Sequence, residues 1–100
     1  MFSVVLGTSH YMDPEEEWAV HGFATQCEAQ EYARRFIRAQ VEQHRHAAPA
    51  DTIRHYHHFG DYAAAEGLDS TAWVAFCADN PATHPDETDH AALEPNRTLP

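Results

Sequence analysis

The chain has 100 residues and 43% hydrophobic content, which predicts one domain with a single core. Its formal net charge of −10 argues against direct binding to nucleic acid, whose phosphates would be repelled, and favours a positively charged protein partner. The chain has two cysteines, no basic lead of a signal peptide and no apolar run near the roughly 20 residues of a membrane span, so we expect a cytoplasmic protein with reduced thiols and no membrane partner.

Two strands are predicted at the start of the chain. Apolar residues alternate with less apolar ones over residues 2–7, which is the period-two pattern of a strand. A second strand is predicted over residues 18–24. The stretch between them contains Asp13-Pro14, a turn former, followed by a run of glutamates. We therefore expect a hairpin with a charged loop.

The longest predicted element is a helix over residues 25–48. Thr25 and Glu28 have the spacing of a capping box, in which the threonine hydroxyl accepts from the backbone N–H of the glutamate. Apolar residues then recur at helical spacings and predict a buried face made of Ala29, Ala33, Phe36, Ile37, Val41, Ala47 and Ala48. The predicted exposed face is charged and consists of Glu31, Arg35, Arg38, Glu42 and Arg45. Pro49 disfavours helical geometry before it, so we expect the helix to end near Ala48.

The second half of the chain predicts one more helix and one more hairpin. A short helix is expected from an N-cap at Asp51 to a stop at Gly60. Residues 61–66 and 71–78 are expected to be strands joined by a turn, because the second stretch has β-favouring residues on both faces. The predicted fold is α+β: a small antiparallel sheet (β-β-α-α-β-β) with one long and one short helix packed on one face.

Acidic residues supply the candidate contact surface. We predict a folded domain over residues 1–80 and a Pro- and acid-rich, partly irregular C-terminal tail over residues 81–100. Carboxylates on a rigid domain can imitate the phosphates of nucleic acid and occupy a basic groove, with aromatic side chains as anchors. The predicted partner-binding residues are Tyr11, Asp13, Glu15, Glu16, Glu17, Trp18, Asp86, Glu87 and Asp89.

Histidines offer an alternative function. Imidazole is a common ligand of transition metals, so His44, His55 and His58 predict a small metal- or ligand-binding protein as the alternative. On a helix His55 and His58 face the same way, which gives two ligands where a catalytic zinc takes three from the protein and a structural zinc four. We therefore predict no metal and no cofactor.

Two further groups carry chemistry that we weigh against the acidic surface. Cys27 in the first turn of the long helix, with His21 nearby, has the residue types of a nucleophile and its base. No acidic orienter or oxyanion motif accompanies them, so we predict that the protein is not an enzyme and has no catalytic residues. Arginines on the long helix form an edge of the kind that contacts phosphates, which we interpret as a solvated face: Arg34, Arg35, Arg38 and Arg45.

The sequence thus predicts a non-enzymatic, acidic protein-binding module. In composition, though in no motif, it resembles small acidic phage- and plasmid-type inhibitors of restriction or CRISPR systems, and this resemblance implies a nucleic-acid mimic that blocks a basic groove on a nucleic-acid-processing partner. A homodimer through the outer face of the sheet is a further expectation, with Trp18, Tyr62 and Trp73 as the contact residues.

Overall fold

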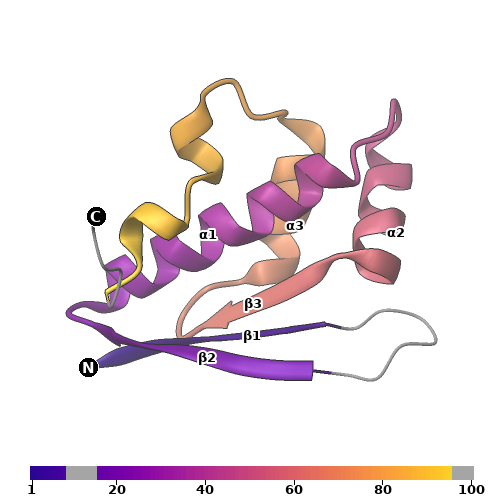
Figure 1. Ribbon diagram of the computed structural model, residues 1–100. Coiled ribbons are helices and arrows are strands. Elements are labelled where there is room, and N and C mark those ends of the chain that lie inside the picture. Colours follow the sequence, from indigo (N-terminus) through magenta and orange to yellow (C-terminus); the bar gives the residue numbers. More distant parts are fainter. Residues whose placement is uncertain (9–15, 96–100) are drawn as a thin grey trace.

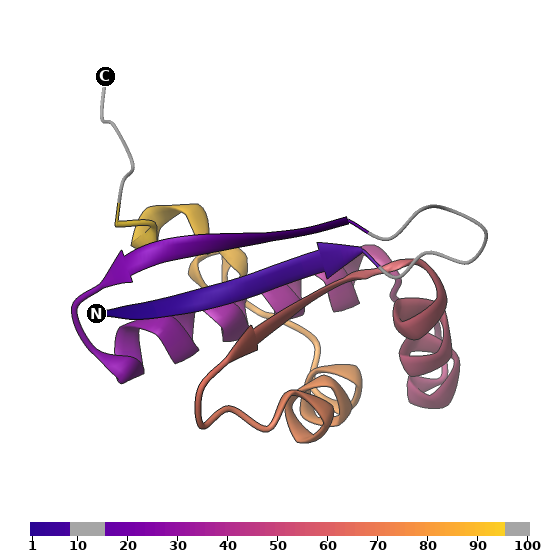
Figure 2. The same cartoon turned by 90° about the horizontal axis from the view of Figure 1, so that it is seen from below.

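The computed structural model describes residues 1–8 and 16–95. Its strands form one antiparallel sheet of order β2-β1-β3, and Figures 1 and 2 show all three helices on the same side of that sheet. The elements in chain order are β1 (Phe2–Thr8), β2 (Glu16–Phe23), α1 (Gln26–Gln43), α2 (Pro49–Phe59), β3 (Asp61–Ala65), α3 (Ser70–Asp79) and the 3₁₀ turns η1 (Pro85–Thr88) and η2 (Ala91–Leu93). The α+β class and the first hairpin are confirmed.

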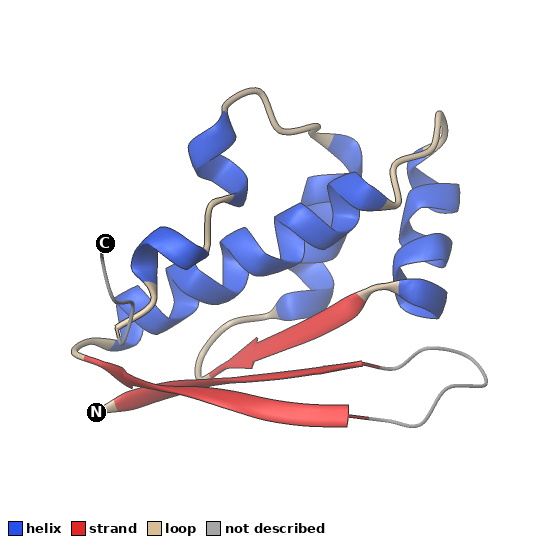
Figure 3. Cartoon of the chain, viewed as in Figure 1, coloured by secondary structure: helices blue, strands red, loops and turns tan. Residues whose placement is uncertain are grey.

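The predicted second hairpin is wrong, so the element order is β-β-α-α-β-α and not β-β-α-α-β-β. Residues 61–65 do form a strand, but it pairs with β1, and the stretch expected as its partner is helix α3 (Figure 3). Asp69 caps this helix, because its carboxylate accepts from the backbone N–H of Ala72 at 3.1 Å. Val74 and Cys77 are buried at helical spacing. A short apolar run is compatible with the two-residue period of a strand and with the 3.6-residue period of a helix. The capping bond of Asp69 favours the helix.

The centre of the core is β1. Val4 and Leu6 are fully buried, and both face the helices. Directly paired residues point to the same face of a sheet, so Ala65 and Ala63 of β3 lie beside them on the helix side. Val20 of β2 is the other neighbour of Val4. The apolar face of β1 is thus covered by α1 and flanked by alanines on the β3 side.

The outer face of the sheet carries a tyrosine that lies across a glycine. Gly7 pairs with Tyr62, and a Cβ on Gly7 would lie 2.4 Å from the Tyr62 ring. The Tyr62 hydroxyl donates to Glu17 Oε2 at 2.8 Å. One ring therefore spans the sheet from β3 to β2, and only glycine leaves it room.

Helix α1 begins as predicted and ends earlier than predicted. Thr25 is its N-cap, with Oγ1 accepting from the N–H of Glu28 at 3.1 Å. The helix ends at Gln43, and Ala47 and Ala48, which were predicted to be buried, are exposed. Just beyond the helix end, Arg45 reaches across to carbonyls at the end of α3.

Residues 81–95 lie along α1. Figure 1 shows η1 on the side of α1 that faces away from the sheet. His90 stands edge-on to Tyr32 and Phe36, with ring centroids 5.5 and 5.0 Å apart, and Leu93 packs against the core. Within residues 1–8 and 16–95, no helix has the length and apolarity needed to cross a membrane.

Candidate functional site

Helix α3 has an apolar exposed face. Its buried side consists of Val74, Cys77 and Ala78, and its outward side presents Ala72, Ala75 and Phe76. Phe76 is 48% exposed, which is unusual for a large apolar side chain on a helix that already contributes to the core. The exposed side of α1, in contrast, carries Glu28, whereas α2 exposes Phe59 as well as Arg54. An apolar face among charged surfaces is typical of an interaction site.

Contacts from α1 hold the aromatic pair on α3 in place. The rings of Trp73 and Phe76 stack, with centroids 5.2 Å apart and planes at 13°. The guanidinium carbon of Arg38 lies 5.1 Å from the Trp73 centroid and 5.7 Å from that of Phe76. The Trp73 indole donates from Nε1 to the Arg34 carbonyl at 2.9 Å. The exposed ring of Phe76 is thus pre-positioned, which lowers the entropy lost on binding.

Carboxylates surround this face. Asp69 lies at the N-terminus of α3 and Asp79 is its last residue, while Asp86 is exposed on η1. Within the described residues, the side chains of Asp79 and Asp86 make no hydrogen bond or ion pair. α3 therefore presents an apolar centre with free negative charge at its C-terminal side.

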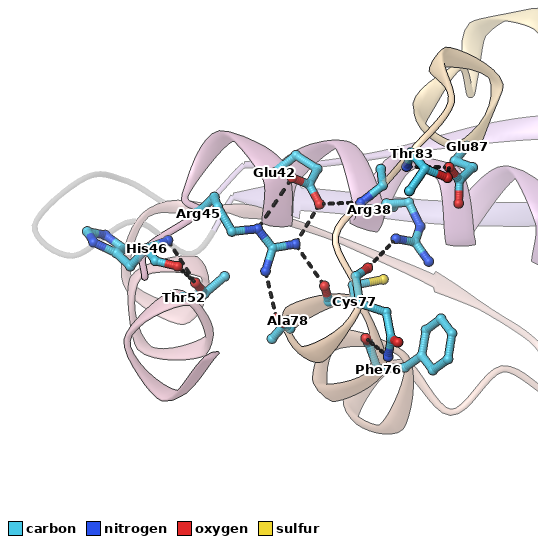
Figure 4. A network of polar contacts seen from close by, with 12 residues as sticks. Arg38, Glu42, Arg45, His46, Thr52, Phe76, Cys77, Ala78, Thr83 and Glu87 are labelled. Carbon is cyan, nitrogen blue, oxygen red and sulfur yellow. Dashed lines mark hydrogen bonds and ion pairs between the residues drawn. The ribbon is translucent and has the colours of Figure 1, made fainter. Parts of the chain in front are cut away.

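A network from α1 fixes the C-terminal end of α3 (Figure 4). Arg45 donates to the carbonyls of Ala78 and Cys77 at 2.6 and 2.8 Å and also binds Glu42. Glu42 accepts a further bond from the N–H of Ala82 at 3.0 Å. Burial raises the pKa of Glu42, but the bonds from Arg45 and Ala82 outweigh burial and hold it below its ordinary value. Arg38, which was expected on the exposed face of the helix, is instead buried.

A pocket of about 230 Å³ lies beside the aromatic pair, between α1, α3 and η1. Its walls combine three arginines of α1, one aromatic side chain of α3 and three carboxylates. The lining residues are Glu31, Arg34, Arg35, Arg38, Trp73, Asp86 and Glu87. Side chains of opposite charge thus line one small volume.

The predicted acidic surface is divided between two places. Tyr11, Asp13 and Glu15 lie outside the described residues. Glu16 and Glu17 are exposed on β2, whereas η1, with the other predicted acids, lies beyond α1 (Figure 1). The two groups therefore do not share one surface within the described chain.

Several of the predicted contact residues have local roles. Glu87 accepts from the backbone N–H groups of Thr83 and His84, both at 2.7 Å, and these bonds lower its pKa. Asp89 accepts from the N–H of Ala92 in η2 at 3.2 Å. Asp86 has no such role, which leaves it available to a partner or ligand.

The three aromatic residues expected on the outer sheet face do not share that face. Trp18 pairs with Leu6, whose side chain points to the helices, so Trp18 lies on the helix side at the edge of the sheet. Trp73 is in α3, and Tyr62 is on the outer face.

The histidines form ring contacts rather than a triad. His44 lies against Phe59, with centroids 6.5 Å apart, and His46 lies against His55 at 4.0 Å. In the part of the chain that the structure describes, no group of three His, Cys, Asp or Glu side chains could hold a metal ion. Partial burial, and then the neighbouring charges of His46, Arg54 and His58, lower the pKa of His55.

The two cysteines differ in access. Cys27 is exposed in the first turn of α1, and His21 forms its hydrogen bond with Ser3 Oγ, at 2.7 Å. Cys77 is fully buried in α3, and burial raises its pKa to about 11. The structure therefore does not assemble the Cys27–His21 pair considered from the sequence.

No family model, curated protein or solved structure matches the chain. Its exposed α3 face and its pocket are the features that bear on function. The sequence prediction missed both, because residues 71–78 were interpreted as a strand. The signal that could have found them is Asp69 at a capping position before alanines at 72, 75 and 78.

Proposed function

We propose that the protein is a non-enzymatic binding module that docks onto a basic protein partner through the exposed face of α3. The observation that carries this proposal is the pre-positioned ring of Phe76, surrounded by Ala72 and Ala75 and bordered by free carboxylates at Asp79 and Asp86. Protein interfaces combine an apolar centre, in which aromatic anchors contribute most of the affinity, with a polar rim.

The state of the charged side chains supports a cationic partner. Each arginine of residues 16–95 has an acceptor: Glu31 for Arg34 and Arg35, the Asn80 carbonyl for Arg38, Glu42 for Arg45 and Asp51 for Arg54. Several exposed carboxylates in the described chain have no such partner, namely Glu16, Glu28, Glu66, Asp79 and Asp86. Unpaired carboxylates on the surface therefore contribute to the net charge of −10. They favour association with a positively charged protein surface.

The partner that fits this chemistry is a basic groove that otherwise holds DNA or RNA. Carboxylates bordering a rigid apolar face can take the place of phosphates in such a groove. This interpretation keeps the inhibitor role predicted from the composition but assigns the contact to α3 and Asp86 in place of the β2 end of the sheet.

The test is affinity capture from cells of the source organism with the immobilised protein. We expect a basic protein that competing DNA releases, and that detaches between roughly 50 and 200 mM salt. Phe76→Ser combined with Asp79→Asn should abolish its capture. Glu28→Gln combined with Glu66→Gln is the control, because it removes free carboxylates far from Phe76, and it should capture normally. Equal capture by both double variants, or no captured protein, would refute the proposal.

A further inference from the structure

The pocket beside Trp73 contains guanidinium groups whose donors are mostly unused. Arg38 is 5% exposed, yet within residues 1–8 and 16–95 its side chain makes one hydrogen bond, to the Asn80 carbonyl at 2.8 Å. Within the same residues Arg35 makes one hydrogen bond, to the Asp89 carbonyl at 3.2 Å, and Arg34 makes one, to Gln30 at 3.4 Å. A guanidinium carries several N–H donors in a planar fork. These three line one small cavity with most of their donors free.

The carboxylate of Glu31 is a poor partner for these donors. It lies 3.5 Å from both Arg34 Nη1 and Arg35 Nε, whereas a strong charge-assisted bond is roughly 2.7–2.9 Å long. Glu31 divides its carboxylate between the two guanidinium groups and makes a short contact with neither. An oxyanion that enters the pocket can approach the guanidinium forks more closely.

The part of the pocket lining that η1 contributes offers negative charge. Glu87 is already bonded to Thr83 and His84, but Asp86 has no partner within the described residues. The lining thus holds an unused acceptor as well as unused donors, and Trp73 is part of the same lining.

We propose that this pocket binds a small zwitterionic molecule, with a phosphate or carboxylate on Arg34, Arg35 and Arg38 and an ammonium group on Asp86. A zwitterion suits a chain of net charge −10, because its ammonium group offsets charge on its oxyanion and so weakens the long-range repulsion that a simple anion meets. A volume of about 230 Å³ accommodates such a compound. The ligand site does not depend on docking through α3.

The first test uses phosphoethanolamine and β-alanine, which place an ammonium two carbons from a phosphate or a carboxylate. Binding is followed by the two indole N–H signals in NMR, since Trp73 lines the pocket and Trp18 lies on β2. We expect a saturable shift of the Trp73 signal with at least one probe and none for Trp18. The tighter probe identifies the preferred oxyanion.

The second test compares each probe with its separate halves. Inorganic phosphate and ethanolamine should each bind roughly tenfold more weakly than phosphoethanolamine, because each engages only one wall. Equal binding by inorganic phosphate would overturn the zwitterion assignment, and no saturable shift with either zwitterion would overturn the site.

Variants assign the contacts. Arg34→Gln and Asp86→Asn should each weaken binding roughly tenfold. The Arg54–Asp51 pair on α2 supplies matched controls, because Arg54→Gln and Asp51→Asn make the same charge changes outside the pocket. Both controls should bind as the unmodified protein does. Weakening of the same size in the controls would show a general charge effect and refute the proposed site.

Discussion

Replacing Arg45 with methionine tests how α3 is held against α1. The side chain donates to the Ala78 carbonyl at 2.6 Å and the Cys77 carbonyl at 2.8 Å, where a helix carries partial negative charge (Figure 4). A hydrogen bond from a charged donor contributes about 1.5–3 kcal/mol when buried. Because the Arg45 side chain is partly exposed, we take the lower end for each bond and expect a total loss of about 2–4 kcal/mol.

The same substitution should change the pH dependence of stability through Glu42. The pKa of Glu42 is lower in the folded protein than in the unfolded chain, so its contribution is present above the unfolded pKa and is lost as pH falls through the folded pKa. Arg45→Met removes the bond and the charge that hold this pKa down. The stability lost on moving from neutral to acidic pH should therefore be smaller in the variant.

Urea unfolding followed by tryptophan fluorescence, at neutral pH and near pH 3.5, measures both effects. The control is Arg54→Met, because Arg54 also has an acidic partner three residues before it but a 65% exposed side chain. The control should lie within about 0.5 kcal/mol of the unmodified protein. Equal losses for the two variants, or an unchanged pH dependence for Arg45→Met, would refute the account of the α3 anchor.

Three further predictions concern other parts of the fold. Gly7→Ala should cost about 1–3 kcal/mol, because its Cβ would overlap the Tyr62 ring, and the urea-measured loss should vanish in a Tyr62→Ala background; persistence of the loss would contradict this. In the folded protein a thiol reagent should label Cys27 rapidly and the buried Cys77, with its pKa of about 11, only on unfolding; equal rates by mass spectrometry would refute the burial. The lowered pKa of His55 means that the unfolded state binds more protons, so Tm should fall as pH drops below about 6.5, and His55→Gln should flatten that slope; a variant with an unchanged slope would contradict the assignment.

Local signals predicted the elements whose cause is local. The start of α1 depends on Thr25 and Glu28, which are neighbours in sequence, and the predicted cap bond is present. The helix ends at Gln43, earlier than predicted, and Arg45 just beyond it contacts carbonyls of Ala78 and Cys77, which nothing in the helix pattern indicates. Pro49 was interpreted as the stop of the first helix but is the first residue of α2.

The site was less predictable than the fold, because it depends on which elements meet. The helical spacing of Arg34, Arg35 and Arg38 was visible in the sequence, but their interpretation as a solvated face required that nothing pack beside them. Trp73 packs there only because the chain after Asp69 is a helix. The acidic composition was equally visible, whereas the local bonds that occupy Glu87 were not.

The most direct test of the central claim is amide hydrogen exchange of the protein alone and in complex with its captured basic partner. The account predicts that the partner slows exchange in α3 and η1, over residues 70–79 and 85–88, and leaves the amides of β2 unchanged. Slowed exchange in β2, with α3 and η1 exchanging as in the free protein, would contradict it.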